Sequence, residues 1–210
     1  MIQEGSIKIV YKQGIDFSNP KFWDEKGWGR EPLSKTLNCT EFGATFFPAA
    51  DHNLCLTAYH DTTPVGYVAT NLYSVFYRNV QHSIQQHKQD GVPENIAKFI
   101  NVISWAVKEG ENKYYSLIEQ YGWEEDLISH SCGLMVIDDY ANKGIGSELY
   151  RRRSEMLKSK GKKALILETT NKFSANAIKK DSRFVIVASK NYKEFGIDLD
   201  DCYTVWCGIL

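Results

Sequence analysis

The sequence predicts an α/β (α+β) fold in which helices flank a mixed central sheet of about seven strands. Alternating segments rich in β-branched and aromatic residues lie in the first third of the chain and predict antiparallel strands. A long helical stretch follows them. Beyond residue 130, an apolar segment, a helical segment and a second apolar run come in succession, which implies two parallel strands joined by a right-handed crossover.

Length and composition favour a single globular domain over residues 1–210. The chain has 210 residues, 43% of them hydrophobic, which is enough to bury a core without disulfides. Lys and Arg number 25 against 26 Asp and Glu, so the charge balance indicates neither a nucleic acid nor a membrane as a partner. The N-terminal residues lack the features of a signal peptide. We therefore expect a cytoplasmic protein, as a monomer or a weak dimer.

The cysteines follow no ligand or disulfide pattern. There are five of them, and none forms a Cys-x-x-Cys pair. An odd number without paired spacing predicts buried, reduced thiols and no bound metal.

Strands alternate with short helices in the first third of the chain. The strands are predicted over residues 6–11, 54–59 and 65–73. A hairpin loop at 60–64 joins the last two, so these strands form an antiparallel unit. Helical turns are predicted after Pro20 and over residues 31–37, where Leu33 and Leu37 fall on one face.

The middle of the chain predicts helices. Residues 76–93 are polar and predict a helix or a mobile connection. Apolar residues then recur at helical spacing in two groups, which predict amphipathic helices over residues 96–107 and 114–121. Gly122 marks the end of the second helix, because glycine readily adopts the left-handed conformation that terminates helices.

A glycine turn follows the strand that is predicted over residues 133–137. Residues 138–140 turn the chain, and Gly144-Ile145-Gly146 leads directly into a helix. The first N–H groups of such a helix have no partner within it, and together with the positive end of the helix dipole they form an anion site. Glycine also lets a phosphate approach the backbone closely. We interpret the turn as a pyrophosphate site, against the alternative that the glycines serve steric needs alone.

The helix after the turn has an apolar face at Ile145, Leu149 and Leu157, and Gly161 ends it. The arginines at 151–153 lie mainly on its other faces, and two of the three are predicted to form an ordinary solvated surface. The remaining elements are a buried central strand over residues 164–168, a short helix after 169–176, and strands over 184–187 and 203–210 with a loop at 190–201.

This order of elements, with an anion site after the fourth strand, resembles the GCN5-related N-acetyltransferase (GNAT) superfamily, and within it the insect-type arylalkylamine and dopamine N-acetyltransferases. The resemblance rests on Arg-Glu-Pro-Leu at 30–33, on the helical insert with Tyr-Tyr-Ser-Leu-Ile-Glu-Gln-Tyr-Gly at 114–122, and on Leu-Met-Val-Ile-Asp-Asp-Tyr-Ala-Asn-Lys-Gly-Ile-Gly at 134–146. The last segment is similar to the superfamily's acetyl-CoA loop, Arg/Gln-x-x-Gly-x-Gly/Ala. Its glycines fit at 144 and 146, whereas Ala141 stands at the position of the Arg or Gln. Phosphate binding would therefore depend on backbone N–H donors.

The resemblance implies direct transfer of an acetyl group from acetyl-CoA, the cosubstrate, to a small primary amine, with a carboxylate general base. It implies Glu31 as that base, although a carboxylate is also favoured at a helix N-terminus for electrostatic reasons alone. Thr170 and Ser174 match hydroxyls that act in proton transfer in the family, although both residue types also cap helices. His130 resembles a histidine of vertebrate relatives, with a proton relay or a structural hydrogen bond as its two interpretations.

The same resemblance assigns the cofactor site. We expect backbone groups of Met135 and Ile137, with Val136 between them, on the pantetheine arm. The pyrophosphate is expected at Asn142, Lys143, Gly144, Ile145, Gly146 and Ser147. Lys143 and Arg151 are candidates for further phosphate contacts.

Two alternatives stay open at this point. The substrate could be a polyamine or a peptide amine, which the acidic residues at 124–126 would favour. Alternatively, the protein could be a catalytically inactive acyl-CoA-binding sensor of the same fold, which the departures at Ala141 and Thr170 would permit.

Overall fold

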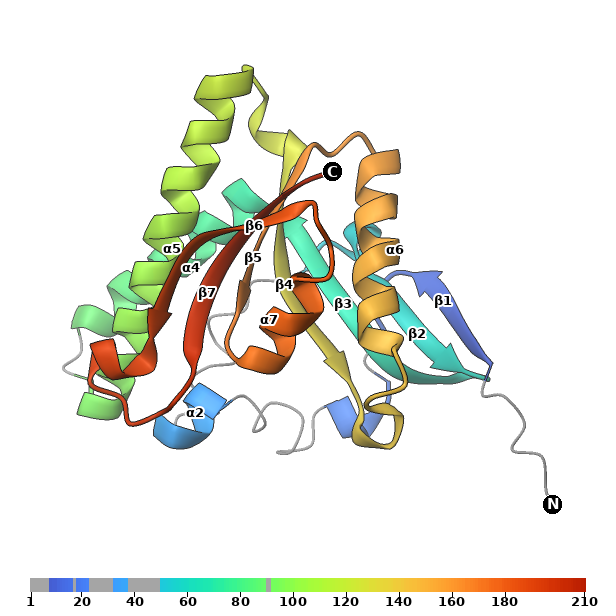
Figure 1. The fold of residues 1–210 in the computed structure, drawn as a ribbon, viewed down its shortest axis with the longest axis horizontal. Coiled ribbons are helices and arrows are strands. Elements are labelled where there is room, and N and C mark those ends of the chain that lie inside the picture. Colours follow the sequence, from blue (N-terminus) through green and yellow to red (C-terminus); the bar gives the residue numbers. More distant parts are fainter. Residues whose placement is uncertain (1–7, 17, 23–31, 38–49, 90–91) are drawn as a thin grey trace.

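The computed structural model describes residues 8–16, 18–22, 32–37, 50–89 and 92–210. Within these ranges the strands form one seven-stranded sheet in the order β1-β2-β3-β4-β5-β7-β6 (Figure 1). The strands are β1 (Ile9–Gln13), β2 (Leu56–His60), β3 (Thr63–Leu72), β4 (Ile128–Val136), β5 (Ala164–Thr169), β6 (Phe184–Asn191) and β7 (Cys202–Ile209). The predicted mixed sheet is confirmed, with an antiparallel unit at β1 to β3 and a parallel pair at β4 and β5.

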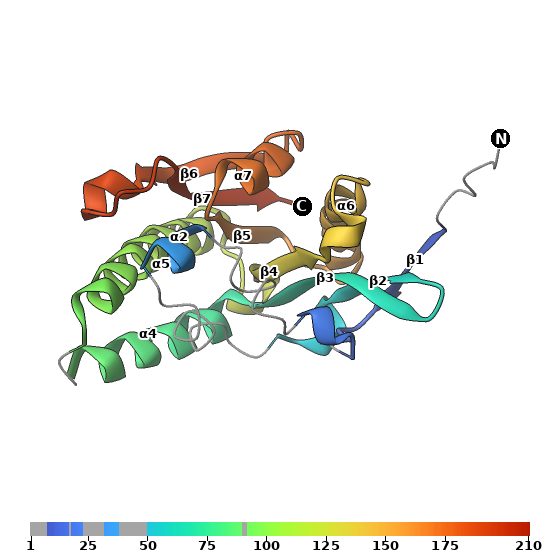
Figure 2. The same ribbon diagram turned by 90° about the horizontal axis from the view of Figure 1, so that it is seen from below.

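Helices cover both faces of this sheet. They are α2 (Pro32–Leu37), α4 (Tyr73–Gln89), α5 (Glu94–Tyr121), α6 (Ile145–Ser159) and α7 (Lys172–Ile178). Figure 2 shows α4 and α6 on opposite sides of the sheet, and α5 shares a hydrophobic cluster with α4. The predicted helical insert between the third and fourth strands is confirmed as α4 and α5. In the part of the chain that the structure describes, no helix combines the length and the apolar character needed to cross a membrane.

A single helix replaces the two that were predicted after residue 95. Helix α5 continues for 28 residues through both apolar groups. Gly110 lies between those groups without interrupting the helix. A Cβ atom at Gly110 would lie 2.6 Å from the Tyr73 hydroxyl, so the glycine permits close packing against α4. Gly122 ends the helix as predicted, with a φ of 65°.

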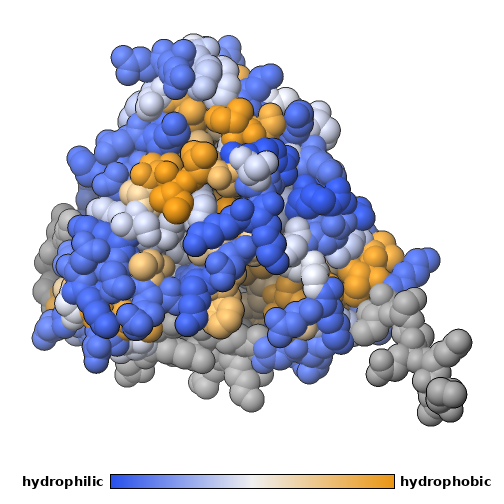
Figure 3. Space-filling model, in the orientation of Figure 1, coloured by the Kyte–Doolittle hydropathy of each residue, from blue (hydrophilic) through white to orange (hydrophobic). Residues whose placement is uncertain are grey.

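The edge strand β6 continues past the predicted end at residue 187. A register shift between Ile186 and Ala188 interrupts its pairing with β7, and the polar residues beyond the shift still pair. An edge strand has only one partner, so polar residues are tolerated there. Val185 and Ile186 are exposed on β6, and an apolar patch lies over this part of the face shown in Figure 3.

Helix α6 confirms the predicted apolar face, and two of its three consecutive arginines, Arg151 and Arg152, are exposed as predicted. Ile145, Leu149 and Leu157 are buried, whereas Arg151 is exposed. Arg153, in contrast, is fully buried, although the sequence predicted no buried arginine on this helix. Two residues along an α-helix correspond to a rotation of about 200°. Arg151 and Arg153 therefore point to opposite sides of the helix, and Arg153 is the one arginine of the three that does not lie on the solvated surface.

The two central strands of the sheet diverge. The parallel pairing of β4 with β5 covers only the segments 128–130 and 164–166. Beyond it, β4 continues to Val136 in pairing with β3, and β5 continues to Thr169 in pairing with β7 (Figure 1). Among the described residues, one edge of β4 therefore has no partner strand from Ser131 onward, and this fork positions the site that follows.

Candidate active site

The glycine turn lies at the open end of the fork. After β4 the chain passes through the 3-10 turn Asp138–Tyr140 and then adopts left-handed conformations at Asn142 (φ 60°) and Gly144 (φ 77°) before α6 begins. Gly144 contributes no side chain to cap the helix, so in the described part of the chain no side-chain cap occupies the first turn of α6. No described side chain therefore competes with an anion for the N–H groups of that turn.

Side chains from distant parts of the chain fix the approach to this turn. The Lys21 Nζ atom lies 2.5 Å from Asp139 Oδ2, and the His60 Nδ1 atom lies 2.5 Å from the Tyr140 hydroxyl. Lys143 places its ammonium group 5.0 Å from the centre of the Tyr140 ring. The turn is therefore held against β2 and the N-terminal segment.

The unpartnered edge of β4 carries different backbone groups from those predicted. Ile137 donates its N–H to the Val65 carbonyl at 3.0 Å, so this donor is used by the neighbouring strand. Backbone groups of successive residues in a strand point to alternate edges, which assigns Met135 to the same side as Ile137. The backbone groups of Met135 and Ile137, which we expected on the pantetheine arm, therefore face β3 and not the open edge. Alternation instead places the groups of Leu134 and Val136 at the open edge.

The start of α6 packs directly on this part of β4. A Cβ atom added to Gly146 would lie 3.5 Å from Leu134 Cδ2 and 3.8 Å from Val136 Cγ2. The N–H groups of the helix and the open edge of the strand therefore lie in one continuous region.

A buried acid–base pair lies where the strands diverge. The His130 Nε2 atom is 2.7 Å from Glu168 Oε2, and the two side chains are only 2% and 11% exposed. Phe76 stacks on the imidazole with 3.4 Å between the ring centres. The other carboxylate oxygen of Glu168 is buried and has no hydrogen-bond partner among the described residues. His130 therefore makes the structural hydrogen bond that was one of its two interpretations. Its partner, the Glu168 carboxylate, can accept a further hydrogen bond at its other oxygen.

The two predicted hydroxyl residues flank the start of α7. Between them, Asn171 caps the helix by accepting the Ser174 N–H at 3.0 Å. Ser174 also donates its hydroxyl to the Asn171 carbonyl at 2.9 Å. Thr170 follows β5, and its carbonyl accepts the Tyr192 hydroxyl at 2.8 Å. The structure brings both hydroxyl residues to the end of β5, and the capping role falls to Asn171.

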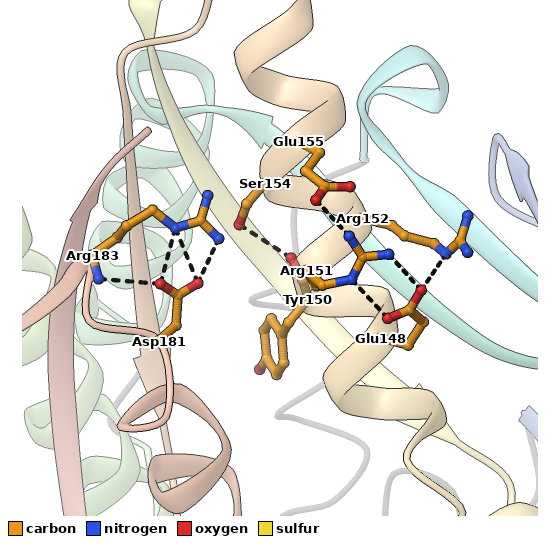
Figure 4. Close-up of polar contacts among 8 residues, drawn as sticks. All are labelled: Glu148, Tyr150, Arg151, Arg152, Ser154, Glu155, Asp181 and Arg183. Carbon is orange, nitrogen blue, oxygen red and sulfur yellow. Dashed lines mark hydrogen bonds and ion pairs between the residues drawn. The ribbon is translucent and has the colours of Figure 1, made fainter.

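The remaining predicted site residues are Glu31 and Arg151. Glu31 lies outside the described residues, and α2 begins at the next position. Buried Leu33 and Leu37 anchor α2, and Asn95 on α5 donates to the Leu37 carbonyl at 2.7 Å. Arg151 is held on the surface of α6 by Glu148 and Glu155, so its guanidinium is already engaged (Figure 4).

Sequence patterns did not single out Glu168. It follows an apolar run that predicts a buried central strand, and only its charge distinguishes it. A carboxylate at the end of such a run is rarely buried without a partner, which is the signal that could have indicated a site. Among the described residues, no three His, Cys, Asp or Glu side chains gather closely enough to hold a metal ion.

Comparison with solved structures identifies the same fold in insect enzymes. Arylalkylamine N-acetyltransferase 2 from Aedes aegypti superposes with a TM-score of 0.69 at 16% identity, covering 96% of this chain and 99% of that protein. The Drosophila melanogaster polyamine N-acetyltransferase, which forms N-acetylagmatine, gives a TM-score of 0.64 at 13% identity, covering 97% of this chain and 100% of that protein. At these identities the likeness concerns the fold.

The family follows from the sequence itself. No curated protein sequence matches the chain significantly. The sequence profile of the acetyltransferase (GNAT) family matches residues 21–179, which is more than half of the chain and includes β4, the glycine turn and α6. The chain therefore belongs to the GNAT family of N-acetyltransferases, enzymes that use acyl-CoA.

Proposed function

We propose that this protein transfers the acetyl group of acetyl-CoA to a primary amine of the arylalkylamine class. The observation that carries the proposal is the continuity of two sets of free backbone groups. The open edge of β4 leads to the uncapped first turn of α6, as a pantetheine arm followed by a pyrophosphate would require. Leu134 and Val136 would bind the pantetheine arm, and the backbone of residues 142–147 would bind the pyrophosphate.

The transfer is proposed to be direct, in a ternary complex. An acetyl-enzyme would need an activated nucleophile. Cys132 lies near the fork, but burial raises the pKa of its thiol well above the usual value, and the thiol therefore stays protonated. Attack by the substrate amine itself is the simpler route.

The amine must lose a proton before it attacks the thioester. Glu31 is the proposed base on the strength of its Glu-Pro-Leu segment. The His130–Glu168 pair supports a relay that receives this proton, because one Glu168 oxygen has no partner among the described residues and the imidazole can carry a proton on either nitrogen. Thr170 or Ser174 is proposed to return a proton to the CoA thiolate.

The arylalkylamine assignment rests on the family segment and on structural likeness to the insect enzyme of that class. Polyamines are the competing class. The acidic residues Glu124, Glu125 and Asp126 precede β4, at the end that pairs with β5 and opposite the glycine turn. Their position gives no support to a role in binding a polyamine at the fork.

Steady-state acetylation of tryptamine, dopamine, agmatine and spermidine by the full chain tests the proposal, with release of the CoA thiol as the readout. The arylalkylamines should have the highest kcat/KM. Turnover of the polyamines without turnover of the arylalkylamines would overturn the substrate class. Calorimetric binding of acetyl-CoA without acetylation of any of these amines would favour the inactive sensor.

The base is tested by Glu31→Gln, which should lower kcat/KM by about 10²- to 10⁴-fold. Glu124→Gln is the matched control, since this carboxylate lies away from the fork. A Glu31→Gln enzyme with activity within a few-fold of the parent would exclude Glu31 as the base.

A further inference from the structure

A buried arginine with unsatisfied donors lies beneath α6. Arg153 is 0% exposed, and its Nη1 donates to the Ser131 hydroxyl on β4 at 2.5 Å. Its Nε and Nη2 atoms are buried and have no hydrogen-bond partner among the described residues. Tyr150 covers one face of the guanidinium, with 4.8 Å between Cζ and the ring centre. The proposed acetyl transfer makes no use of this group.

Nε and Nη2 form the edge of a guanidinium that grips an anion with two parallel hydrogen bonds. Figure 4 shows that edge in use on two other arginines. Arg151 donates from Nε and Nη2 to the Glu148 carboxylate at 2.8 and 2.7 Å, and Arg183 donates from the same atoms to Asp181 at 2.9 and 2.6 Å. On Arg153 the equivalent edge is inside the protein, and no carboxylate of the described residues binds it.

Among the described residues, no carboxylate forms a hydrogen bond or an ion pair with Arg153. Burial lowers the pKa of Arg153 to about 10, so the guanidinium remains protonated at neutral pH. The groups that favour its charged form are Tyr150, Cys132 and Cys55. Burial raises the pKa of each of these side chains, to about 11 for Cys55, so all of them are neutral at pH 7.

Hydroxyl groups complete the surroundings. Thr70 is the cross-strand partner of Ser131, and Ser129 lies two positions earlier on the same side of β4. The hydroxyls of Thr70 and Ser129 are buried and have no partner among the described residues. The layer between α6 and the sheet therefore contains a cation and several O–H donors, in a setting where unpaired polar groups are costly.

We propose that this layer is a binding site for a small inorganic monovalent anion of the halide type, held by Nε–H and Nη2–H of Arg153. A water molecule could accept these hydrogen bonds but would leave a buried positive charge without a counterion, which is strongly unfavourable. A halide compensates the charge, accepts bonds from N–H and O–H donors together, and is small enough for a closed interior site.

Bromide is the probe that tests this site in a crystal. Crystals of the wild-type protein grown in sodium bromide should give an anomalous scattering peak within hydrogen-bonding reach of Nε and Nη2 of Arg153. A water molecule at that position, with no anomalous peak, would overturn the proposal. This measurement needs no variant and does not depend on catalytic activity.

Thermal unfolding gives a second test in solution. Replacing sodium gluconate by sodium bromide at constant ionic strength should raise the Tm of the wild-type protein until the site saturates. Arg153→Met should abolish that rise, whereas the control Arg183→Met should retain it, because its edge is occupied by Asp181. Equal responses of the wild type and Arg153→Met would refute the site. If Arg153→Met does not fold, the crystal measurement decides.

Discussion

Replacing Gly146 by alanine should separate cofactor binding from folding. The added Cβ would lie at ordinary van der Waals distances of 3.5 and 3.8 Å from the Leu134 and Val136 side chains. Gly146 lies within α6 and is not among the residues with positive φ. Alanine is a better helix former than glycine by up to about 1 kcal/mol, so the variant should unfold at the same Tm or up to about 4 °C higher.

The effect on acetyl-CoA should be opposite in sign. If the pyrophosphate approaches the backbone of this turn, the new methyl group occupies the space next to the Gly146 N–H. The KM for acetyl-CoA should rise at least tenfold, which corresponds to about 1.4 kcal/mol of lost binding. Initial rates at saturating amine give this KM, and calorimetry of acetyl-CoA binding provides a check that is independent of turnover.

The control lies at the other end of the same helix. Gly161 has a φ of 80° with no atom within 4 Å of an added Cβ, so Gly161→Ala should cost about 1 kcal/mol through backbone strain alone. Its KM for acetyl-CoA should equal that of the parent. An unchanged KM in Gly146→Ala would refute the assignment of the turn to the pyrophosphate.

Further predictions concern the acid–base pair, a helix cap and acid stability. His130→Asn and Glu168→Gln should each lower kcat by at least about tenfold, and the double variant should lose little more, because the pair acts as a unit; multiplicative losses would contradict the relay. Asn171→Ala should cost about 1 kcal/mol in urea denaturation by removing the cap of α7, and an unchanged midpoint would contradict that role. Hydrogen bonds, chiefly from Arg151, lower the pKa of Glu148 from 4.5 to about 2. The stability that they contribute is complete above pH 4.5 and is lost as the pH falls toward 2. Urea titrations at a series of pH values should therefore show a shallower acid loss for Glu148→Gln, and an equal loss would contradict the assignment.

The fold could be predicted largely from local patterns. Alternation gave the antiparallel strands, and the strand–helix–strand order gave the parallel pair. The single helix α5 could not be foreseen, because Gly110 breaks a local pattern while its packing partner, Tyr73, lies in a different helix. Propensity describes a glycine in isolation, whereas its role here depends on a tertiary contact.

The candidate site was predicted less completely, for a related reason. The glycine turn is local, and it was found where the sequence indicated. The His130–Glu168 pair joins residues on two strands, and no spacing along the chain encodes their 2.7 Å contact. The burial of Arg153 was not predicted, because its neighbours in sequence are also arginines. Helical rotation alone places it on the opposite side of α6 from Arg151.

A bulge in β4 connects these separate features. The register between β3 and β4 shifts between Ala69 and Thr70, which pair with Gly133 and Ser131 and leave Cys132 without an opposite residue. Before the bulge, Ser131 faces α6, as its bond to Arg153 shows. After it, Leu134 and Val136 lie next to Gly146 of α6, so the side-chain alternation has moved by one position.

The same bulge accounts for the fork and for the misassigned backbone groups. An extra residue bends a strand and increases its twist. The parallel ladder with β5 ends at His130, just before the bulge, and Gly133 accommodates the distortion with a φ of 132°. The shift by one residue also turns the backbone groups of Leu134 and Val136, rather than those of Met135 and Ile137, toward the open edge. One inserted residue thus opens the sheet and selects which backbone groups of β4 lie at its open edge.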